Sequence, residues 1–276
     1  MSKFHELSAS LIFNLNLLLT PSKIHLPNIL MFMKKILLIV SGLLLGSFVF
    51  AQVDTTITPR VVAPKLNIQT RSNDHLLIEI GYAAWSGKPD SLKTTGIPRS
   101  FNAYFMFDFP FKTSPKISAA IGAGISTDNI YFKEMSVGLK EQTVMIPFKN
   151  LADSNHFKKY KLATAWLEAP VELRFSSNPV ENGKSFKVAI GAKIGTLLNA
   201  HTKGKTLQDK DDKTLNAYIA KENSKHYFNT TRLSVTGRIG YGHFTLFTNY
   251  SVTALFKEGT AAVIHPFSIG LALSGL

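Results

Sequence analysis

The chain has 276 residues, no cysteine and a formal net charge of +13. The lack of cysteine excludes a disulfide framework and thiolate metal sites. Beyond residue 51, no run of apolar residues approaches the roughly 20 that a membrane-spanning helix needs, which excludes a helical membrane protein. Nucleic acid is not an expected partner either, because no platform of interleaved aromatic and basic residues accompanies the positive charge.

The N-terminal part of the chain carries an export signal. Met33-Lys34-Lys35 precedes an apolar run at residues 36–50, and the small residues Val49 and Ala51 stand just before Gln52. This order is typical of a cleaved secretory signal peptide, and the run is short for the alternative, a membrane anchor. We therefore expect 1–32 to be an upstream start assigned too early, 33–51 the signal peptide, 52–75 a periplasmic lead-in and 76–276 the folded domain.

Eight segments follow in which apolar and polar residues alternate. Alternation with a period of two predicts β-strands with one apolar and one polar face. Gly242-His243 separates the two clearest segments and predicts a tight hairpin. In chain order the segments are 76–85, 101–111, 117–126, 162–175, 186–198, 230–241, 244–256 and 264–276.

The connections between these segments alternate in length. Those after the first, third and fifth segments are long, whereas those after the second, fourth and sixth are short. Short periplasmic turns and long extracellular loops are typical of outer-membrane barrels with an even number of strands. The sequence therefore predicts an all-β fold, an eight-stranded antiparallel up-and-down transmembrane β-barrel, with long loops at 86–100, 127–161 and 199–229.

The apolar faces of these segments carry no charged residue, so the charged residues would point into the barrel. An eight-stranded barrel is only wide enough for its own side chains. Buried charges must pair or bear a large desolvation cost, so we expect internal ion pairs rather than an open pore. Among them we expect Glu168, Glu172, Lys193 and Arg238 to form one network. The full expected set of lumen charges is Glu79, Asp108, Glu168, Glu172, Arg174, Lys187, Lys193, Arg232 and Arg238.

Residues 166–175, Trp-Leu-Glu-Ala-Pro-Val-Glu-Leu-Arg-Phe, resemble the "YLEIPLLLK"-type strand of PorT-like outer-membrane β-barrel proteins from Bacteroidetes. Residues 189–195 resemble the glycine-rich strand that follows it, and residues 249–256 the penultimate strand of that family. The resemblance implies an eight-stranded outer-membrane barrel, and PorT itself is associated with protein secretion across that membrane. The chain departs from the pattern at its end, where Leu276 faces inward in the expected register and an outward aromatic residue is usual.

Motifs for phosphate or calcium binding are incomplete. Residues 183–185, Gly-Lys-Ser, lack the upstream glycine of a phosphate-binding loop, since position 178 is Asn. Asp209, Asp211 and Asp212 lack the glycine and terminal Glu of a calcium loop. We expect no cofactor and no metal.

A hydrolase would need a nucleophile, a base and an orienting carboxylate in one place. His201, His226 and His265 lie near the expected extracellular ends, with Ser224 and Ser251 available, but no spacing ties a Ser to a His and a carboxylate. The sequence therefore favours a non-enzymatic scaffold or partner-binding protein, with a partner in a secretion or envelope complex. The alternatives are a lipid-modifying outer-membrane enzyme and a small solute channel.

Six lysines lie at the bases of the expected long loops. There they would meet the phosphates of lipopolysaccharide, which with outer-membrane lipid is an expected partner; ordinary solvated loops are the alternative. The six are Lys149, Lys158, Lys159, Lys161, Lys203 and Lys205.

Overall fold

The computed structural model describes residues 75–274. The expected signal peptide, nearly all of the lead-in and Leu276 lie outside the described residues. No helix in the described part is long and apolar enough to cross a membrane. Eight long strands dominate it: β1 (Leu76–Ser86), β2 (Arg99–Phe111), β3 (Ser114–Phe132), β6 (His156–Ser176), β7 (Phe186–Gln208), β9 (Thr231–Tyr241), β10 (Phe244–Ser251) and β11 (His265–Ser274).

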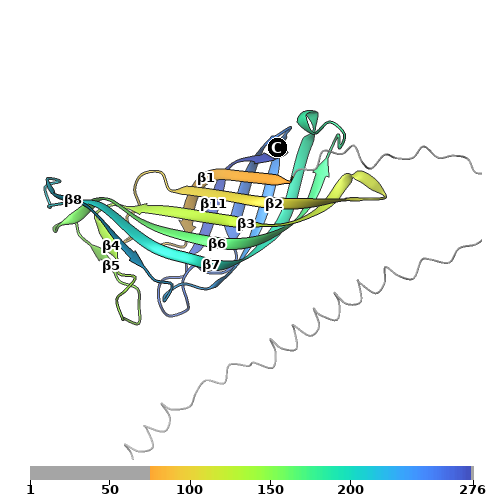
Figure 1. Ribbon diagram of the computed structural model, residues 1–276. Coiled ribbons are helices and arrows are strands. Elements are labelled where there is room, and N and C mark those ends of the chain that lie inside the picture. Colours follow the sequence, from red (N-terminus) through yellow and green to blue (C-terminus); the bar gives the residue numbers. More distant parts are fainter. Residues whose placement is uncertain (1–74, 275–276) are drawn as a thin grey trace, which may run out of the picture. The chain divides into compact units, whose positions relative to one another are not determined.

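These eight strands close into an antiparallel barrel (Figure 1). Each strand pairs with the next in the order β1, β2, β3, β6, β7, β9, β10 and β11. The ring is completed because β11 pairs back with β1, with Leu77 opposite Ser274. The predicted eight-stranded barrel is confirmed.

The short connections all lie at one end of the barrel, which we call the turn end. In the β9–β10 hairpin Tyr241 lies opposite Phe244, so Gly242 and His243 form a two-residue turn. Gly242 has a φ of +62°, and a Cβ there would lie 2.7 Å from the Gly183 carbonyl oxygen. Glycine suits this position because it adopts positive φ without steric penalty. The opposite end, with the long connections, is the loop end.

The outward face of the barrel carries an apolar belt. Residues of every strand contribute large apolar side chains that are exposed although the barrel is closed. The inward neighbours of these residues are buried and include charged groups, so the barrel is inverted relative to a soluble one. Members of the belt are Ile80, Phe105, Ile121, Val171, Ile190, Val235, Leu246 and Leu271.

Three strands run further toward the loop end than the sequence indicated. β3 continues to Phe132, β6 begins at His156 and β7 continues to Gln208, so much of the expected loops at 127–161 and 199–229 is strand. The apolar alternation that marks a lipid-facing strand stops where both faces meet water or loops. For that reason the pattern ended before the strands did.

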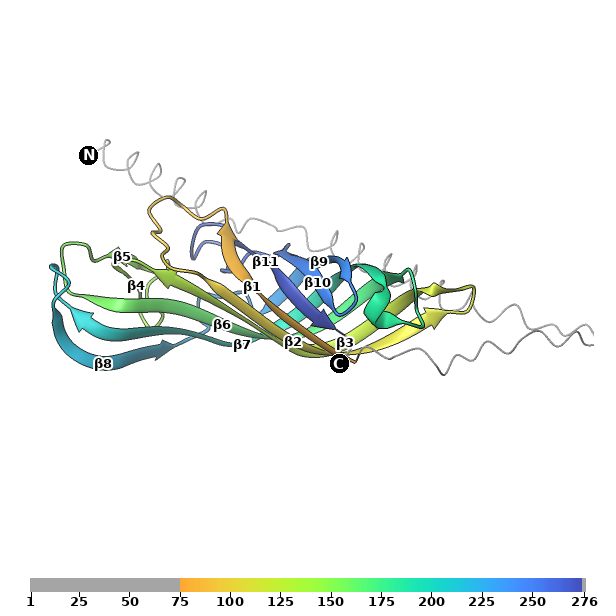
Figure 2. The ribbon, with the colours of Figure 1, turned by 90° about the horizontal axis from the view of Figure 1, so that it is seen from above.

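The part of β7 near the loop end has a different partner from the part near the turn end. β7 pairs with β9 over Phe186–Thr196 and with β8 (Thr214–Asn223) over His201–Gln208. β8 forms a sheet with residues 156–165 of β6 and 199–208 of β7, beyond the wall of the barrel (Figure 2). We call this three-stranded sheet the platform. Two short strands, β4 (Met135–Val137) and β5 (Phe148–Asn150), pair within the connection between β3 and β6.

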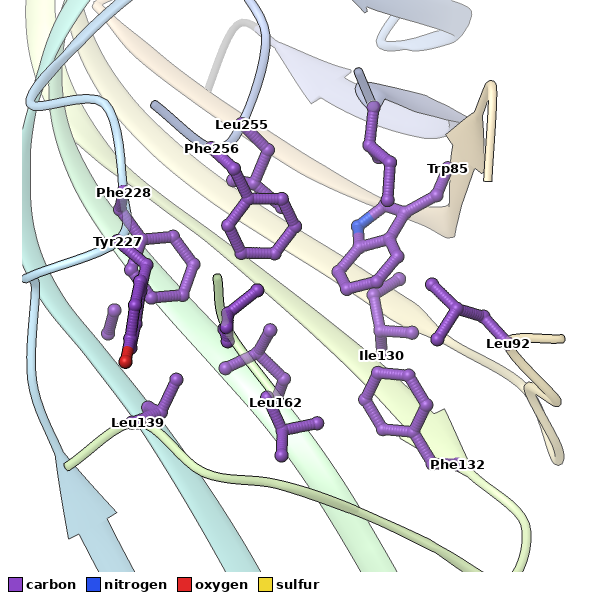
Figure 3. Packing of buried hydrophobic residues seen from close by; sticks show 14 of the residues in the cluster. Trp85, Leu92, Ile130, Phe132, Leu139, Leu162, Tyr227, Phe228, Leu255 and Phe256 are labelled. Atoms are coloured by element: carbon purple, nitrogen blue, oxygen red, sulfur yellow. The ribbon is translucent and has the colours of Figure 1, made fainter. Parts of the chain in front are cut away.

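A cluster of buried apolar side chains fills the loop end of the barrel. Trp85, Phe132 and Leu162 come from the barrel strands, whereas Leu139 and Tyr227 come from the connections. We call this cluster the apolar cap; Figure 3 shows ten labelled members converging: Trp85, Leu92, Ile130, Phe132, Leu139, Leu162, Tyr227, Phe228, Leu255 and Phe256.

Aromatic contacts and one tyrosine tie the cap together. The ring centroid of Trp85 lies 5.8 Å from that of Phe132 and 6.0 Å from that of Phe256. The Tyr227 hydroxyl donates to the Glu141 carbonyl and accepts from the Thr143 backbone N–H at 3.3 Å. The expected strand 244–256 is accordingly wrong at its end, because β10 stops at Ser251 and the chain turns to bury Phe256 in the cap.

Arginine in the apolar belt should destabilise the barrel. Phe105→Arg, Ile121→Arg and Ile190→Arg should each lower the free energy of unfolding in lipid by ~2–4 kcal/mol, the cost of a cation near the bilayer midplane. Denaturant titration in vesicles measures the loss. Val144→Arg is the matched control, since Val144 is 85% exposed and lies outside the barrel strands. Equal tolerance of all four would contradict the membrane-facing register.

Candidate functional site

The lumen below the apolar cap contains charged side chains shielded from solvent. Glu79, Glu168, Glu172, Lys193 and Arg238 are all buried, and so is Arg232. They project from β1, β6, β7 and β9, whose inward faces alternate with the apolar belt. They form an upper cluster near the cap and a lower cluster near the turn end.

In the upper cluster, two carboxylates and two cations interlock. Lys193 lies 2.9 Å from Glu79, and the Lys193 ammonium also donates to the Tyr104 hydroxyl at 3.3 Å. Tyr104 in turn donates to Glu168 at 2.6 Å. The Arg232 Nε donates to Glu168 at 2.9 Å, which joins both ion pairs into one network.

Further groups complete this network from the side of the cap. Arg232 Nη1 lies 2.9 Å from Asp128, and its guanidinium lies 4.5 Å from the ring centroid of Trp166. Asn102 donates to Glu79 at 2.8 Å, and Asn249 does so at 3.2 Å. Every charge of the upper cluster therefore has more than one partner, which offsets the cost of removing it from water.

The lower cluster is centred on Glu172. Arg174 Nε donates to Glu172 at 2.9 Å, and Arg238 Nη2 donates to the same carboxylate oxygen. Arg174 Nη1 also lies 3.9 Å from Asp108. Lys187 lines the same small cavity as Asp108, Arg174 and Arg238.

A glycine in β7 allows charged residues on the strands to either side of it, β6 and β9, to meet. Gly195 of β7 lies opposite both Glu168 of β6 and Arg232 of β9. A Cβ on Gly195 would lie 2.8 Å from the Glu168 side chain. Because glycine leaves that space open, Arg232 reaches over β7 to Glu168.

The expected network of four is divided between the two clusters. Glu172 and Arg238 pair in the lower cluster, as expected. In the upper cluster Lys193 pairs directly with Glu79 and reaches Glu168 only through the Tyr104 hydroxyl. Counting residues from the turn end placed Lys193 level with Glu168, whereas Glu168 lies opposite Gly195 and Lys193 opposite Pro170. The stagger that barrel closure imposes on neighbouring strands explains the two-residue error.

Sequence reasoning missed Tyr104, Asn102 and Asp128 in this network. Tyr104 and Asn102 have the parity of inward residues on β2, so the alternation itself could have identified them. Asp128 was assigned to a long loop, because β3 was expected to end at Ser126. A charged residue next to a strand end is therefore a signal worth testing.

The space left in the lumen is small. One cavity of about 20 Å³ lies beside Glu168 and Lys193, and one of about 40 Å³ lies at the turn end beside Arg174 and Lys187. A single water needs about 10–15 Å³ on this measure. Side chains thus fill the barrel, as is usual for eight strands.

The lysines near the loop end fall into distinct environments. Lys159 lies opposite Lys205 and Lys161 opposite Lys203, and Lys203 also lies opposite Lys221 of β8. Directly opposite residues of antiparallel strands share one face, so five lysines form two rows across the platform. We call them the lysine rows.

Two of the six expected lysines lie elsewhere. Lys149 belongs to β5 and forms an ion pair with Glu141 at 2.7 Å. Lys158, the residue before Lys159 on β6, is exposed and stands outside the lysine rows. The structure brings Lys159, Lys161, Lys203 and Lys205 together and adds Lys221, which the sequence reasoning did not include.

The electrostatics of the platform reflect this crowding. Burial lowers the pKa of the Lys161 ammonium, and the charges of Lys203 and Arg99 lower it further. Burial likewise lowers the pKa of His201, with added contributions from Lys221, Lys161 and Lys203. Lys161 donates to the side-chain oxygen of Asn129 at 2.6 Å, a neutral partner that leaves its charge uncompensated.

The serines and histidines considered for catalysis make structural contacts. His265 Nδ1 lies 3.0 Å from the Ser251 carbonyl, while the Ser251 hydroxyl donates to the Thr253 carbonyl at 2.9 Å. The Ser224 hydroxyl accepts from the His226 backbone N–H at 3.2 Å. Within residues 75–274, no group of three or more His, Asp or Glu side chains is placed to hold a metal ion.

The comparisons with known proteins concern the fold. A family model described as "Outer membrane protein beta-barrel domain" matches residues 66–258. Two crystal structures of Ail, the attachment invasion locus protein of Yersinia pestis, are similar at 13% and 15% identity, with TM-scores of 0.30 and 0.28. They cover 74% and 73% of this chain and 97% of Ail; the first holds the heparin analogue sucrose octasulfate. No curated protein sequence matches the chain.

The Glu172–Arg238 pair should show strong energetic coupling. Glu172→Gln and Arg238→Met should each destabilise the folded barrel, by about 3–5 kcal/mol at full burial, because each leaves a buried charge without this partner. The double variant should lose clearly less than the sum of the two. Unfolding in detergent measures the cycle, and the exposed pair Lys149–Glu141 is the control, with expected coupling under ~1 kcal/mol. Additive losses at Glu172 and Arg238 would contradict the pairing.

Proposed function

Because this chain belongs to the outer membrane protein β-barrel family, we propose that it is a sealed, non-enzymatic barrel that holds its platform at the cell surface for a partner. The filled lumen carries this proposal. Charged clusters occupy its middle and the apolar cap closes the loop end. A barrel closed in this way supports a surface element and offers no route for solutes.

The charges of the lumen argue against an ion-selective channel. Ion selectivity in pores comes from rings of charge of one sign. Here five carboxylates, Glu79, Asp108, Asp128, Glu168 and Glu172, pair with four cations, Arg174, Lys193, Arg232 and Arg238. A fifth cation, Lys187, lines the same cavity as Asp108, so the two signs of charge are balanced in number. Such pairing stabilises a plugged interior rather than an ion path.

The geometry also argues against a lipid-modifying enzyme. A hydrolase needs a nucleophile within hydrogen-bond reach of a base that a third group orients. Ser251 and Ser224 use their hydroxyls on the backbone, and the neighbouring His265 also binds a backbone carbonyl. These contacts fix loop conformation and fit a scaffold.

The outer edge of β8 is the feature best suited to a protein partner. Within the described residues β8 pairs only with β7, which leaves the backbone groups of its other edge open. Leu215, Tyr218 and Ile219 on this strand are exposed. An extended polypeptide can add to such an edge through main-chain hydrogen bonds. The resemblance to PorT-like proteins supports a partner from a secretion or envelope complex.

A sealed barrel should not conduct. Purified protein reconstituted in planar bilayers should give silent recordings, because the cap and the paired charges fill the lumen. Trp85→Ala combined with Phe256→Ala opens only the cap, and the paired charges below it should keep this variant silent as well. Steady wild-type conductance that lumen-directed blockers abolish would instead establish the channel.

Partner binding should depend on the β8 edge. A photo-crosslinking residue at Ile219 should give discrete adducts in intact outer membranes, and Ala217→Pro should remove them because proline disrupts strand pairing. The same crosslinker at Val144, which is more exposed but lies in a connection, is the control. Adducts that persist with Ala217→Pro, or that match those at Val144, would contradict edge pairing.

A further inference from the structure

The lysine rows set cations directly against one another on one sheet face. Lys161–Lys203 and Lys203–Lys221 continue across β6, β7 and β8, with Lys159–Lys205 as the row beyond. Like charges directly opposite in a sheet are destabilising. An arrangement that costs stability in the free protein is consistent with a counter-charge that arrives from outside.

Within residues 75–274, the positions that flank the rows on this face supply no such counter-charge. The outward positions next to the rows are Asn129 and Tyr131 on β3, and Asn223 on β8, none of which is acidic. The nearby Glu222 lies opposite Thr202, which is buried, and so belongs to the inner face. Arg99 and His201 add further basic groups, as the lowered pKa values of Lys161 and His201 reflect.

The position of the rows indicates where the counter-charge comes from. The last exposed apolar residue on β7 is Leu198, five residues before Lys203. At about 3.3 Å per residue and a tilt of about 40°, Lys203 lies on the order of 10 Å above the apolar belt. It faces outward, at the height of lipid headgroups and their attached sugars and phosphates.

We propose that the lysine rows bind clustered phosphate groups, and that these phosphates belong to lipopolysaccharide in the surrounding leaflet. The two rows offer at least two adjacent cation pairs, which suits a headgroup with more than one phosphate. Lys161 and Lys203 form the centre, and Lys221 extends the site toward β8. Binding relieves the repulsion between the lysines and anchors the platform to the membrane surface. The proposal uses the outer-membrane placement but neither a sealed lumen nor a protein partner at β8.

The test is binding of the full barrel in detergent to lipopolysaccharide. Lys161→Gln with Lys203→Gln should weaken binding by at least about 10-fold, since a lysine near an anionic surface contributes a factor of roughly 5. The control, Lys158→Gln with Lys213→Gln, removes the same charge at positions outside the rows, one on β6 and one in the turn between β7 and β8. Gel mobility before and after boiling shows that each variant is folded.

A second measurement separates binding from general stability. Without ligand, the Lys161→Gln, Lys203→Gln variant should unfold at the same or a higher temperature than the wild type, because repulsion is removed. With lipopolysaccharide, the wild type should gain the larger stabilisation. A variant that is less stable without ligand would overturn the proposal.

Two ligand controls decide the chemistry and its source. Dephosphorylated lipopolysaccharide should bind the wild type weakly, with about the affinity that the double variant has for intact lipopolysaccharide. If the wild type binds intact and dephosphorylated lipopolysaccharide equally well, the proposal is overturned. Soluble tripolyphosphate should compete only weakly. If it binds more tightly than the lipid, the site takes a free polyanion and the lipid assignment is wrong. Bilayer conductance is measured separately. A conducting barrel would contradict the sealed lumen but not the binding of lipopolysaccharide by the lysine rows.

Discussion

In the hydrocarbon of a membrane, backbone N–H and C=O groups have no water to bind, so every strand needs a neighbour on both sides. The pairing of β11 with β1 meets this requirement by closing the ring. Closure then sets the rest of the structure. Alternate side chains must face lipid, which forms the apolar belt, and the charged residues between them can only point inward.

The interior of so narrow a barrel leaves no room for solvated charges, and the chain pairs them instead. Gly195 is as important here as the charged residues, because it opens the space through which Arg232 reaches Glu168. The hydroxyl of Tyr104 then links this pair to Lys193 and Glu79. Polar groups joined in this way specify one arrangement of neighbouring strands, since a slip of one residue would turn each of them toward lipid.

Strand number, antiparallel order and inward charges could be predicted from sequence because lipid enforces a strict alternation. The prediction failed where that constraint ends. Beyond the membrane, β7 no longer alternates between apolar and polar residues, so its upper half was assigned to a loop. The cap was missed for a related reason, since Leu139 and Tyr227 come from connections whose folding depends on distant partners. The partner of Lys193 depended on a stagger between strands that no single segment encodes.

The ladder between β6 and β7 shifts register at Ala165 and Trp166, where Leu198 is the extra residue. On β7 the inward residues are therefore odd-numbered below this bulge, as with Lys193 and Leu197, and even-numbered above it, as with Ala200 and Thr202. An uninterrupted strand would keep the lower phase and turn Lys203 and Lys205 toward the interior. A single inserted residue thus switches the phase of the strand as it leaves the bilayer, and the outward direction of Lys203 and Lys205 depends on it.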